Sequence, residues 1–177
     1  MAPSPGHSDA PSLAVDSAGT VHLAYGHRPK GPFRRSLVRY AQAPPDSAFT
    51  TPLALSGRPA AHAASAGFPS LELGPAGAVV VLWELFPTVQ GRPHALGYTR
   101  SADGGTTFGR PAVVTFGRPA VVPGSDADGQ GFNGSQQGLL MDKLAVTAPG
   151  AVAVVNSTFR PGEHSRVRLY RGRLAGP

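Results

Sequence analysis

Arginine is the residue in this chain best suited to hold an anionic ligand, because its planar guanidinium donates two parallel hydrogen bonds to a carboxylate. Arginines supply nearly all of the positive charge in the 177 residues, which carry a formal net charge of +6. Five of them lie in polar segments between apolar runs and are the candidate ligand-binding residues: Arg34, Arg35, Arg58, Arg92 and Arg160.

A polar, glycine-rich loop offers a candidate metal site. Asp126, Asp128 and Asn133 carry hard oxygen ligands among glycines that allow sharp turns, as calcium prefers. Gln130 and Gln137 stand where an EF-hand loop has two of its ligands, so a plain loop and a ligand-binding loop remain alternatives. The histidines form no HExxH or His-x-His pair, and neither zinc nor another cofactor is expected.

Composition excludes several classes of protein. The arginines are scattered without a Lys/Arg block or interleaved aromatics, so we expect no nucleic-acid partner. No apolar run approaches the roughly 20 residues that a membrane-spanning helix needs, and no charged-then-apolar signal segment is present. The chain has no cysteine, whereas its 23 glycines and 19 prolines are typical of an all-β protein rich in turns.

The octet from Ser101 to Phe108 predicts a tight turn between two strands. It reads Ser-Ala-Asp-Gly-Gly-Thr-Thr-Phe. Asp103 can accept hydrogen bonds from backbone N–H groups two or three residues on, the glycines can adopt positive φ, and the phenylalanine can fill apolar space beside the turn. We expect a structural role for five of its residues: Ser101, Asp103, Gly105, Thr106 and Phe108.

An internal repeat of 58 residues surrounds this octet. Pro11–Val15 matches Pro69–Leu73, and Tyr40 matches Tyr98 at the same spacing. A looser third copy begins at Leu144. Short apolar runs bounded by glycine and proline are typical of strands, and each copy holds about four of them. A unit of four antiparallel strands in 50–60 residues is typical of one propeller blade.

The sequence therefore predicts one all-β domain, 1–177, of about three four-stranded antiparallel units. These cover about 8–56, 66–122 and 138–177, and the last is incomplete. The segment Thr-Phe-Gly-Arg-Pro-Ala-Val-Val occurs twice in tandem, at 107–114 and 115–122. A blade has one outer-strand position here, so we expect one copy to pair as the fourth strand and the other to extend the connection.

The octet and the repeat resemble the Asp-box (BNR) repeat of sialidase-like β-propellers. The resemblance implies a partial propeller whose functional loops lie at the end opposite the Asp-box, and it places the five arginines there. It favours an extracellular or periplasmic location. Because propellers close with 4–8 blades, three blades need others. We expect a fragment of a larger propeller; the alternative is a pair of chains that completes one ring.

The resemblance also implies a function. Sialidases use an arginine triad for the substrate carboxylate, an aspartate acid/base, and a tyrosine nucleophile that a glutamate activates. The family's Phe/Tyr-Arg-Ile-Pro motif is absent, and Phe33-Arg34-Arg35-Ser36 shares only its Phe-Arg. Two functions are therefore expected: an incomplete exo-sialidase-type glycoside hydrolase, or a non-catalytic propeller module that binds a glycan or a protein. The predicted partner is a carbohydrate or glycoconjugate.

Glu84 and Tyr25 are the candidate catalytic residues that this resemblance suggests. Glu84 follows Trp83 at the end of a buried-looking strand, and Tyr25 ends the corresponding strand of the first copy. A tyrosine hydroxyl needs a neighbouring base to attack at neutral pH. The structural alternatives are that Glu84 pairs with an arginine such as Arg92, and that Tyr25 packs in the core with its hydroxyl at the rim.

Overall fold

Three antiparallel sheets make up the computed structural model, which describes residues 6–31, 33–57, 64–89, 95–113, 144–148, 151–158 and 166–173. The first sheet has the order β1 (His7–Val15), β2 (Val21–Arg28), β3 (Leu37–Ala43) and β4 (Leu53–Ala54). The second has the order β5 (Ser65–Leu73), β6 (Val79–Phe86), β7 (Ala95–Ser101) and β8 (Ala112–Val113). The third has β9 (Leu144–Ala148), β10 (Ala151–Thr158) and β11 (Arg166–Arg173), with β10 in the middle.

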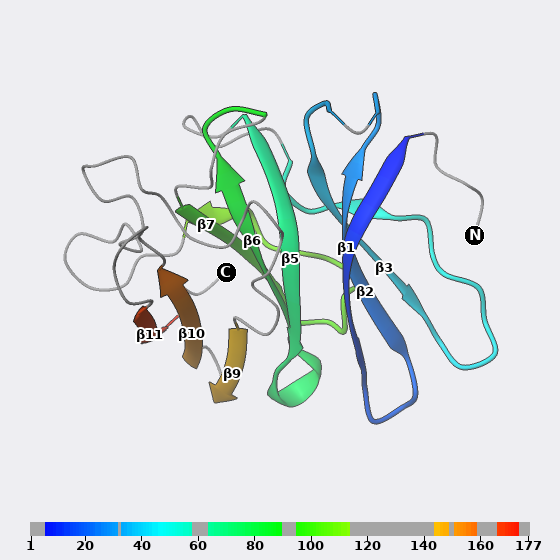
Figure 1. The fold of residues 1–177 in the computed structure, drawn as a ribbon. Coiled ribbons are helices and arrows are strands. Elements are labelled where there is room, and N and C mark those ends of the chain that lie inside the picture. The colour runs from blue at the N-terminus through cyan, green and yellow to red at the C-terminus, as the bar shows by residue number, and fades with distance from the viewer. Residues whose placement is uncertain are drawn as a thin grey trace.

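The sheets lie side by side as blades of an open arc, with β1, β5 and β9 as the inner strands (Figure 1). The prediction of an all-β, propeller-type fold is confirmed. A short 3-10 turn, η1 (Pro75–Gly77), joins β5 to β6. No helix among the described residues is long and apolar enough to cross a membrane.

The 58-residue repeat governs the structure strand by strand. β5, β6 and β7 begin and end 58 residues after β1, β2 and β3, while β8 follows β4 by 59. Even an irregularity repeats: the β1–β2 ladder shifts register after Asp9, and the β5–β6 ladder shifts after Gly67. Ala10 and Phe68, at these two bulges, have φ of 48° and 49°. The two blades thus share their backbone geometry as well as their apolar pattern.

Apolar side chains fill both spaces between the sheets. β6 is buried along its whole length because its two faces pack against different neighbours. Val81 and Trp83 face the first sheet and join a cluster there with Ala24 and Tyr40. Leu82, on the opposite face, joins a second cluster with residues of the third sheet: Leu144, Val152 and Val154.

The duplicated octapeptide contributes the outer strand of the second blade through its first copy. Ala112 pairs with Tyr98, and Val113 pairs with Gly97. The second copy, 115–122, lies outside the described residues.

The two ends of the arc differ. Hairpin turns and η1 lie at the lower end in Figure 1. The upper end, called here the loop-rich end, holds the β2–β3 and β6–β7 connections and the starts of β1 and β5.

Candidate functional site

The Asp-box turn lies at the hairpin end, where β7 leads toward β8. The Asp103 carboxylate accepts hydrogen bonds from the Thr107 backbone N–H at 2.9 and 3.1 Å and from the Thr107 hydroxyl at 2.5 Å. The Ser101 hydroxyl donates to Asp103 Oδ1 at 2.6 Å and accepts from the Gly105 N–H at 2.8 Å. The main partner of Asp103 is thus four residues on, further than the two or three predicted, because Gly104 and Gly105 both adopt positive φ.

This turn also fastens the second blade to the first. The Phe108 ring meets the Tyr40 ring edge-on at a centroid distance of 4.8 Å, and Phe108 packs against the cluster between the two sheets. Tyr40 is 1% exposed. Its hydroxyl donates to Gln42 Oε1 and lies 2.7 Å from His22 Nδ1. The predicted Asp-box residues therefore hold blades together here, and Thr106 adds only a hydroxyl contact to the Asp103 carbonyl.

The hydrogen bonds to Asp103 make the turn sensitive to acid. The Ser101 and Thr107 side chains, with the Thr107 backbone N–H, lower the pKa of Asp103 from 3.8 to about 2. A depressed folded-state pKa stabilises the protein above 3.8, and this contribution is lost as the pH falls toward 2. We expect the free energy of unfolding to fall more steeply across that window in the wild type than in Asp103→Asn, as urea titrations at stepped pH will measure. Parallel slopes would contradict this assignment.

At the loop-rich end, serines join the first two blades. The Ser36 backbone N–H donates to Ser65 Oγ at 2.8 Å, and the Ala66 N–H donates to the Ser36 carbonyl at 3.0 Å. Ser36 begins the β3 side of this joint, and Ser65 and Ala66 begin β5. The first and second blades are thereby held in register next to their inner strands, so side chains at this point have fixed positions.

Asp9 is the acidic group at the loop-rich end of the first blade. Its carboxylate forms an ion pair with Arg28, and His7 Nε2 lies 3.8 Å from Asp9 Oδ2. The Asp9 and Arg28 side chains are 32% and 18% exposed, so ligands in solvent can reach them. A Cβ on Gly26 would stand 2.5 Å from Asp9 Oδ1, so a larger residue at this position would require the carboxylate to move. The bulge at Ala10 redirects the strand beside it, as bulges near functional sites commonly do.

Sequence reasoning did not identify Asp9, although the repeat holds a signal for it. Asp9 pairs with Gly26 across the first blade, and Gly67 pairs with Glu84 at the equivalent place in the second. Each blade therefore has one acid opposite one glycine at this point. The acid lies on the inner strand β1 in the first blade and on the second strand, β6, in the second blade. A carboxylate opposite a glycine in both copies marks the loop-rich end of each blade.

Glu84 and Tyr25 lie on different blades and different faces. Glu84 is 0% exposed and shares the face of Leu82, toward the third sheet. Because the two residues end corresponding strands, Tyr25 was expected to point the same way as Glu84. It instead shares the face of Leu23, which is turned away from the second sheet. Tyr25 is 5% exposed, and its hydroxyl has no hydrogen-bond partner among the described residues. Two sheets separate the pair, and the structure does not bring them together.

Tyr25 instead lies beside a histidine. The two rings meet at right angles with centroids 6.5 Å apart, and His27 Nδ1 lies 3.0 Å from the Ser8 hydroxyl. Burial of His27, with a smaller effect of the Arg39 charge, lowers the pKa of His27. Burial thus favours the neutral imidazole, whose Nδ1 forms a hydrogen bond with the Ser8 hydroxyl.

The predicted ligand-binding arginines are only partly described. Arg34 and Arg35 are exposed in the β2–β3 connection at the loop-rich end, and Arg35 Nη2 donates to the Gly57 carbonyl at 3.2 Å. The described part of the chain holds no cluster of three acidic or histidine residues that could bind a metal. The remaining predicted site residues lie outside the described residues: Arg58, Arg92, Arg160, Asp126, Asp128 and Asn133.

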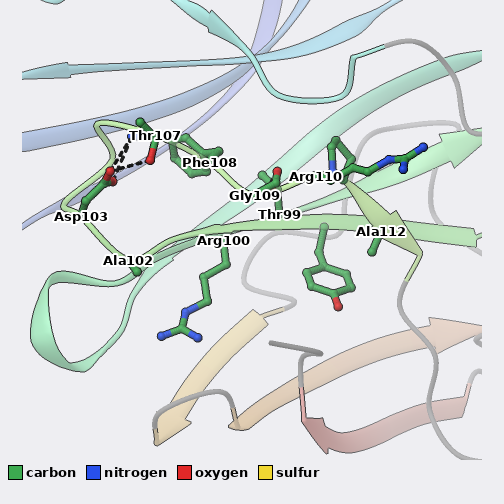
Figure 2. A pocket seen from close by; sticks show the side chains of 11 residues that line it. Thr99, Arg100, Ala102, Asp103, Thr107, Phe108, Gly109, Arg110 and Ala112 are labelled. Carbon is green, nitrogen blue, oxygen red and sulfur yellow. Dashed lines mark hydrogen bonds between the residues drawn. The ribbon is translucent and has the colours of Figure 1, made fainter. Parts of the chain in front are cut away.

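A cavity of about 560 Å³ follows the outer edge of the second blade, between β7 and the chain from Ala102 to Ala112. Its polar side chains include Arg100 and Arg110, which point away from each other in Figure 2. The Asp103 carboxylate in its wall is already occupied by Thr107. Because these charges do not converge on one ligand, the loop-rich end is the stronger candidate site.

Comparisons with known proteins support the fold. No protein-family model and no curated protein matches the chain. Among solved structures, the chain is similar to Hadza microbial sialidase Hz136, with a TM-score of 0.59 and 11% identity over 93% of this chain and 35% of that one. It is also similar to a protein of unknown function from Dyadobacter fermentans DSM 18053, with a TM-score of 0.59 and 14% identity over 94% of this chain and 51% of that one. The fold is sialidase-like, and the chain spans about a third and about half of these two proteins.

Proposed function

We propose that this chain recognises glycans at its loop-rich end, as part of a sialidase-like propeller. The observation that carries the proposal is the ion pair of Asp9 and Arg28 beside the bulge, with Arg34 and Arg35 exposed at the same end. A carboxylate accepts hydrogen bonds from sugar hydroxyls, and guanidinium groups bind an acidic sugar's carboxylate. The sialidase named above shares the fold, and an acidic sugar is therefore the first ligand to test.

Hydrolysis is the second candidate function, and the buried groups make it the weaker one. Glycoside hydrolysis needs two groups that flank the scissile bond, one as acid and one as nucleophile or base. Asp9 is accessible, but Glu84 and Tyr25 are 0% and 5% exposed and lie on different faces. Binding requires only accessible polar groups, and the exposed Arg34 and Arg35 at the loop-rich end support it.

We expect the chain to bind sialyllactose more tightly than lactose. The double variant Arg34→Ala, Arg35→Ala should weaken sialyllactose binding by roughly 10- to 100-fold, because it removes a charge-assisted hydrogen bond to the sugar's carboxylate. Calorimetry or glycan-array binding will measure the difference. Arg110→Ala, an exposed arginine at the outer edge of the second blade, is the matched control and should bind like the wild type. Equal binding of sialyllactose by all three proteins would show that the glycan-binding site does not lie at the loop-rich end.

A fluorogenic sialoside separates binding from hydrolysis. We expect no turnover above buffer for the wild type. Turnover that Asp9→Asn abolishes would instead establish the enzyme, with Asp9 as one of its two catalytic groups. Turnover that survives Asp9→Asn and disappears in Glu84→Gln would restore the residue that the sequence suggested.

A further inference from the structure

Two sheet faces at the ends of the arc expose apolar side chains. On the first sheet, Leu13 is 63% and Val15 is 55% exposed. On the third sheet, Val155 is 39% and Leu169 is 55% exposed, and the two are directly paired across β10 and β11. Aliphatic side chains gathered on an open sheet face usually mark a surface that another element covers.

The repeat shows what kind of surface covers the first of these faces. We call the face of a blade that is turned toward the preceding sheet proximal, and the other face distal. Leu13 pairs with Leu23 on the proximal face of the first blade, and Leu71 pairs with Val81 at the equivalent positions 58 residues on. In the second blade this proximal face is buried, with Leu71 4% exposed, against the distal face of the first blade.

The second uncovered face is of the complementary kind. Leu144 pairs with Val154 on the proximal face of the third blade, which packs against Leu82 and Tyr98 on the distal face of the second. Val155 and Leu169 lie on the opposite, distal face of the third blade. Both seams in the molecule thus join a distal face to a proximal face. Two surfaces are left over at opposite ends of the arc: the distal face of the third blade, and the part of the first blade's proximal face that carries Leu13 and Val15 (Figure 1). Tyr25 and His27 lie on the same proximal face nearer the loop-rich end and are 5% and 1% exposed.

We propose that two copies of this chain associate head to tail and close a ring of two times three blades. In each copy the proximal face carrying Leu13 and Val15 receives the distal face carrying Val155 and Leu169 of the other. The partner is a second copy because this chain itself supplies both halves of the seam. Six blades lie within the range of about 4–8 found in closed propellers. Head-to-tail contacts form a ring only when the rotation closes, and otherwise form filaments.

The inference rests on the fold and not on the proposed glycan binding, and its test measures mass. We expect light scattering after size exclusion to give a monodisperse particle of twice the mass of one chain. Leu13→Glu and Leu169→Lys each place a charge in both seams of a homodimer, and each variant alone should be monomeric. Val89→Glu, an exposed aliphatic residue in the β6–β7 connection, is the control and should remain dimeric.

Mixing the two charge variants gives the sharpest result. In a mixed dimer one seam keeps both native leucines. In the other seam, the carboxylate introduced by Leu13→Glu faces the ammonium group introduced by Leu169→Lys, so mixing should restore the dimer. Far-UV circular dichroism establishes that each variant is folded before mixing. A monomeric wild type would overturn the proposal and assign both faces to further blades of a longer polypeptide. Filaments, or a dimer that survives both charge variants, would overturn it as well.

Discussion

Replacing Gly105 with alanine is expected to lower the free energy of unfolding by about 2–5 kcal/mol, the sum of two costs. Gly105 has φ +86°, where a side chain costs about 1–2 kcal/mol. Its Cβ would overlap the Tyr40 hydroxyl, which is buried against the turn. Overpacking of this kind costs about 1–3 kcal/mol. Tyr40 has little freedom to withdraw, because His22 and Gln42 hold its hydroxyl and Phe108 lies against its ring.

Gly104 is the matched control for this substitution. It neighbours Gly105 in the same turn and has φ +69°, but a Cβ there would meet nothing within 4 Å. Gly104→Ala is therefore expected to cost only the backbone term, about 1–2 kcal/mol. Urea unfolding at one protein concentration will compare the three proteins. If both alanine variants lose the same free energy of unfolding, the close approach of Gly105 to Tyr40 does not contribute to the cost of the Gly105→Ala substitution. A second variant, Tyr40→Phe in the Gly105→Ala background, should recover part of the loss because it removes the clashing oxygen.

The strands could be predicted because the same sequence pattern of apolar and turn residues recurs in successive blades. The apolar runs and turn residues recur at 58-residue spacing, and the strand bounds follow that spacing. The Asp-box predicted a turn, and its phenylalanine predicted an apolar contact. The partner of that phenylalanine, Tyr40, lies 68 positions earlier in another blade, and no local pattern specifies a contact between blades. β1 begins at His7, four residues before the repeated segment Pro11–Val15 and close to the expected start of the first blade at about residue 8, and the ladder continues through polar residues beyond the bulge at Ala10.

The candidate site was harder to predict because its groups meet across strands and blades. Glu84 stands at the end of an apolar run, and this position made it a candidate catalytic residue. Glu84 is 0% exposed and lies on the face of Leu82, which packs against the third sheet, and the sequence of β6 alone contains no information about that neighbour. Asp9 could not be predicted because, unlike Glu84, it does not follow an apolar run. It lies in a polar stretch that looks like a chain end, and its importance comes from Arg28 and Gly26 on the next strand.

The second large effect concerns the packing between blades and compares two equivalent leucines. Leu71→Ala is expected to cost about 2–5 kcal/mol, the usual range for removing a buried leucine side chain. Leu71 is 4% exposed and belongs to the cluster between the first two sheets. Leu13 holds the same place in the first blade but is 63% exposed, and no neighbouring blade among the described residues covers it within one chain. In the monomeric Leu169→Lys background, Leu13→Ala should therefore change stability by no more than about 0.5 kcal/mol.

The background decides what each outcome means. With the wild-type distal face available, head-to-tail pairing would bury Leu13, and Leu13→Ala should then lower the melting temperature by an amount that shrinks as the protein is diluted and the copies separate. Leu71→Ala should cost the same in both backgrounds, because its seam lies within one chain. A Leu13→Ala variant that is silent in both would leave the fold intact and contradict the pairing of two copies. A loss equal to that of Leu71→Ala in the monomer would show that the first blade's proximal face is already covered by its own chain.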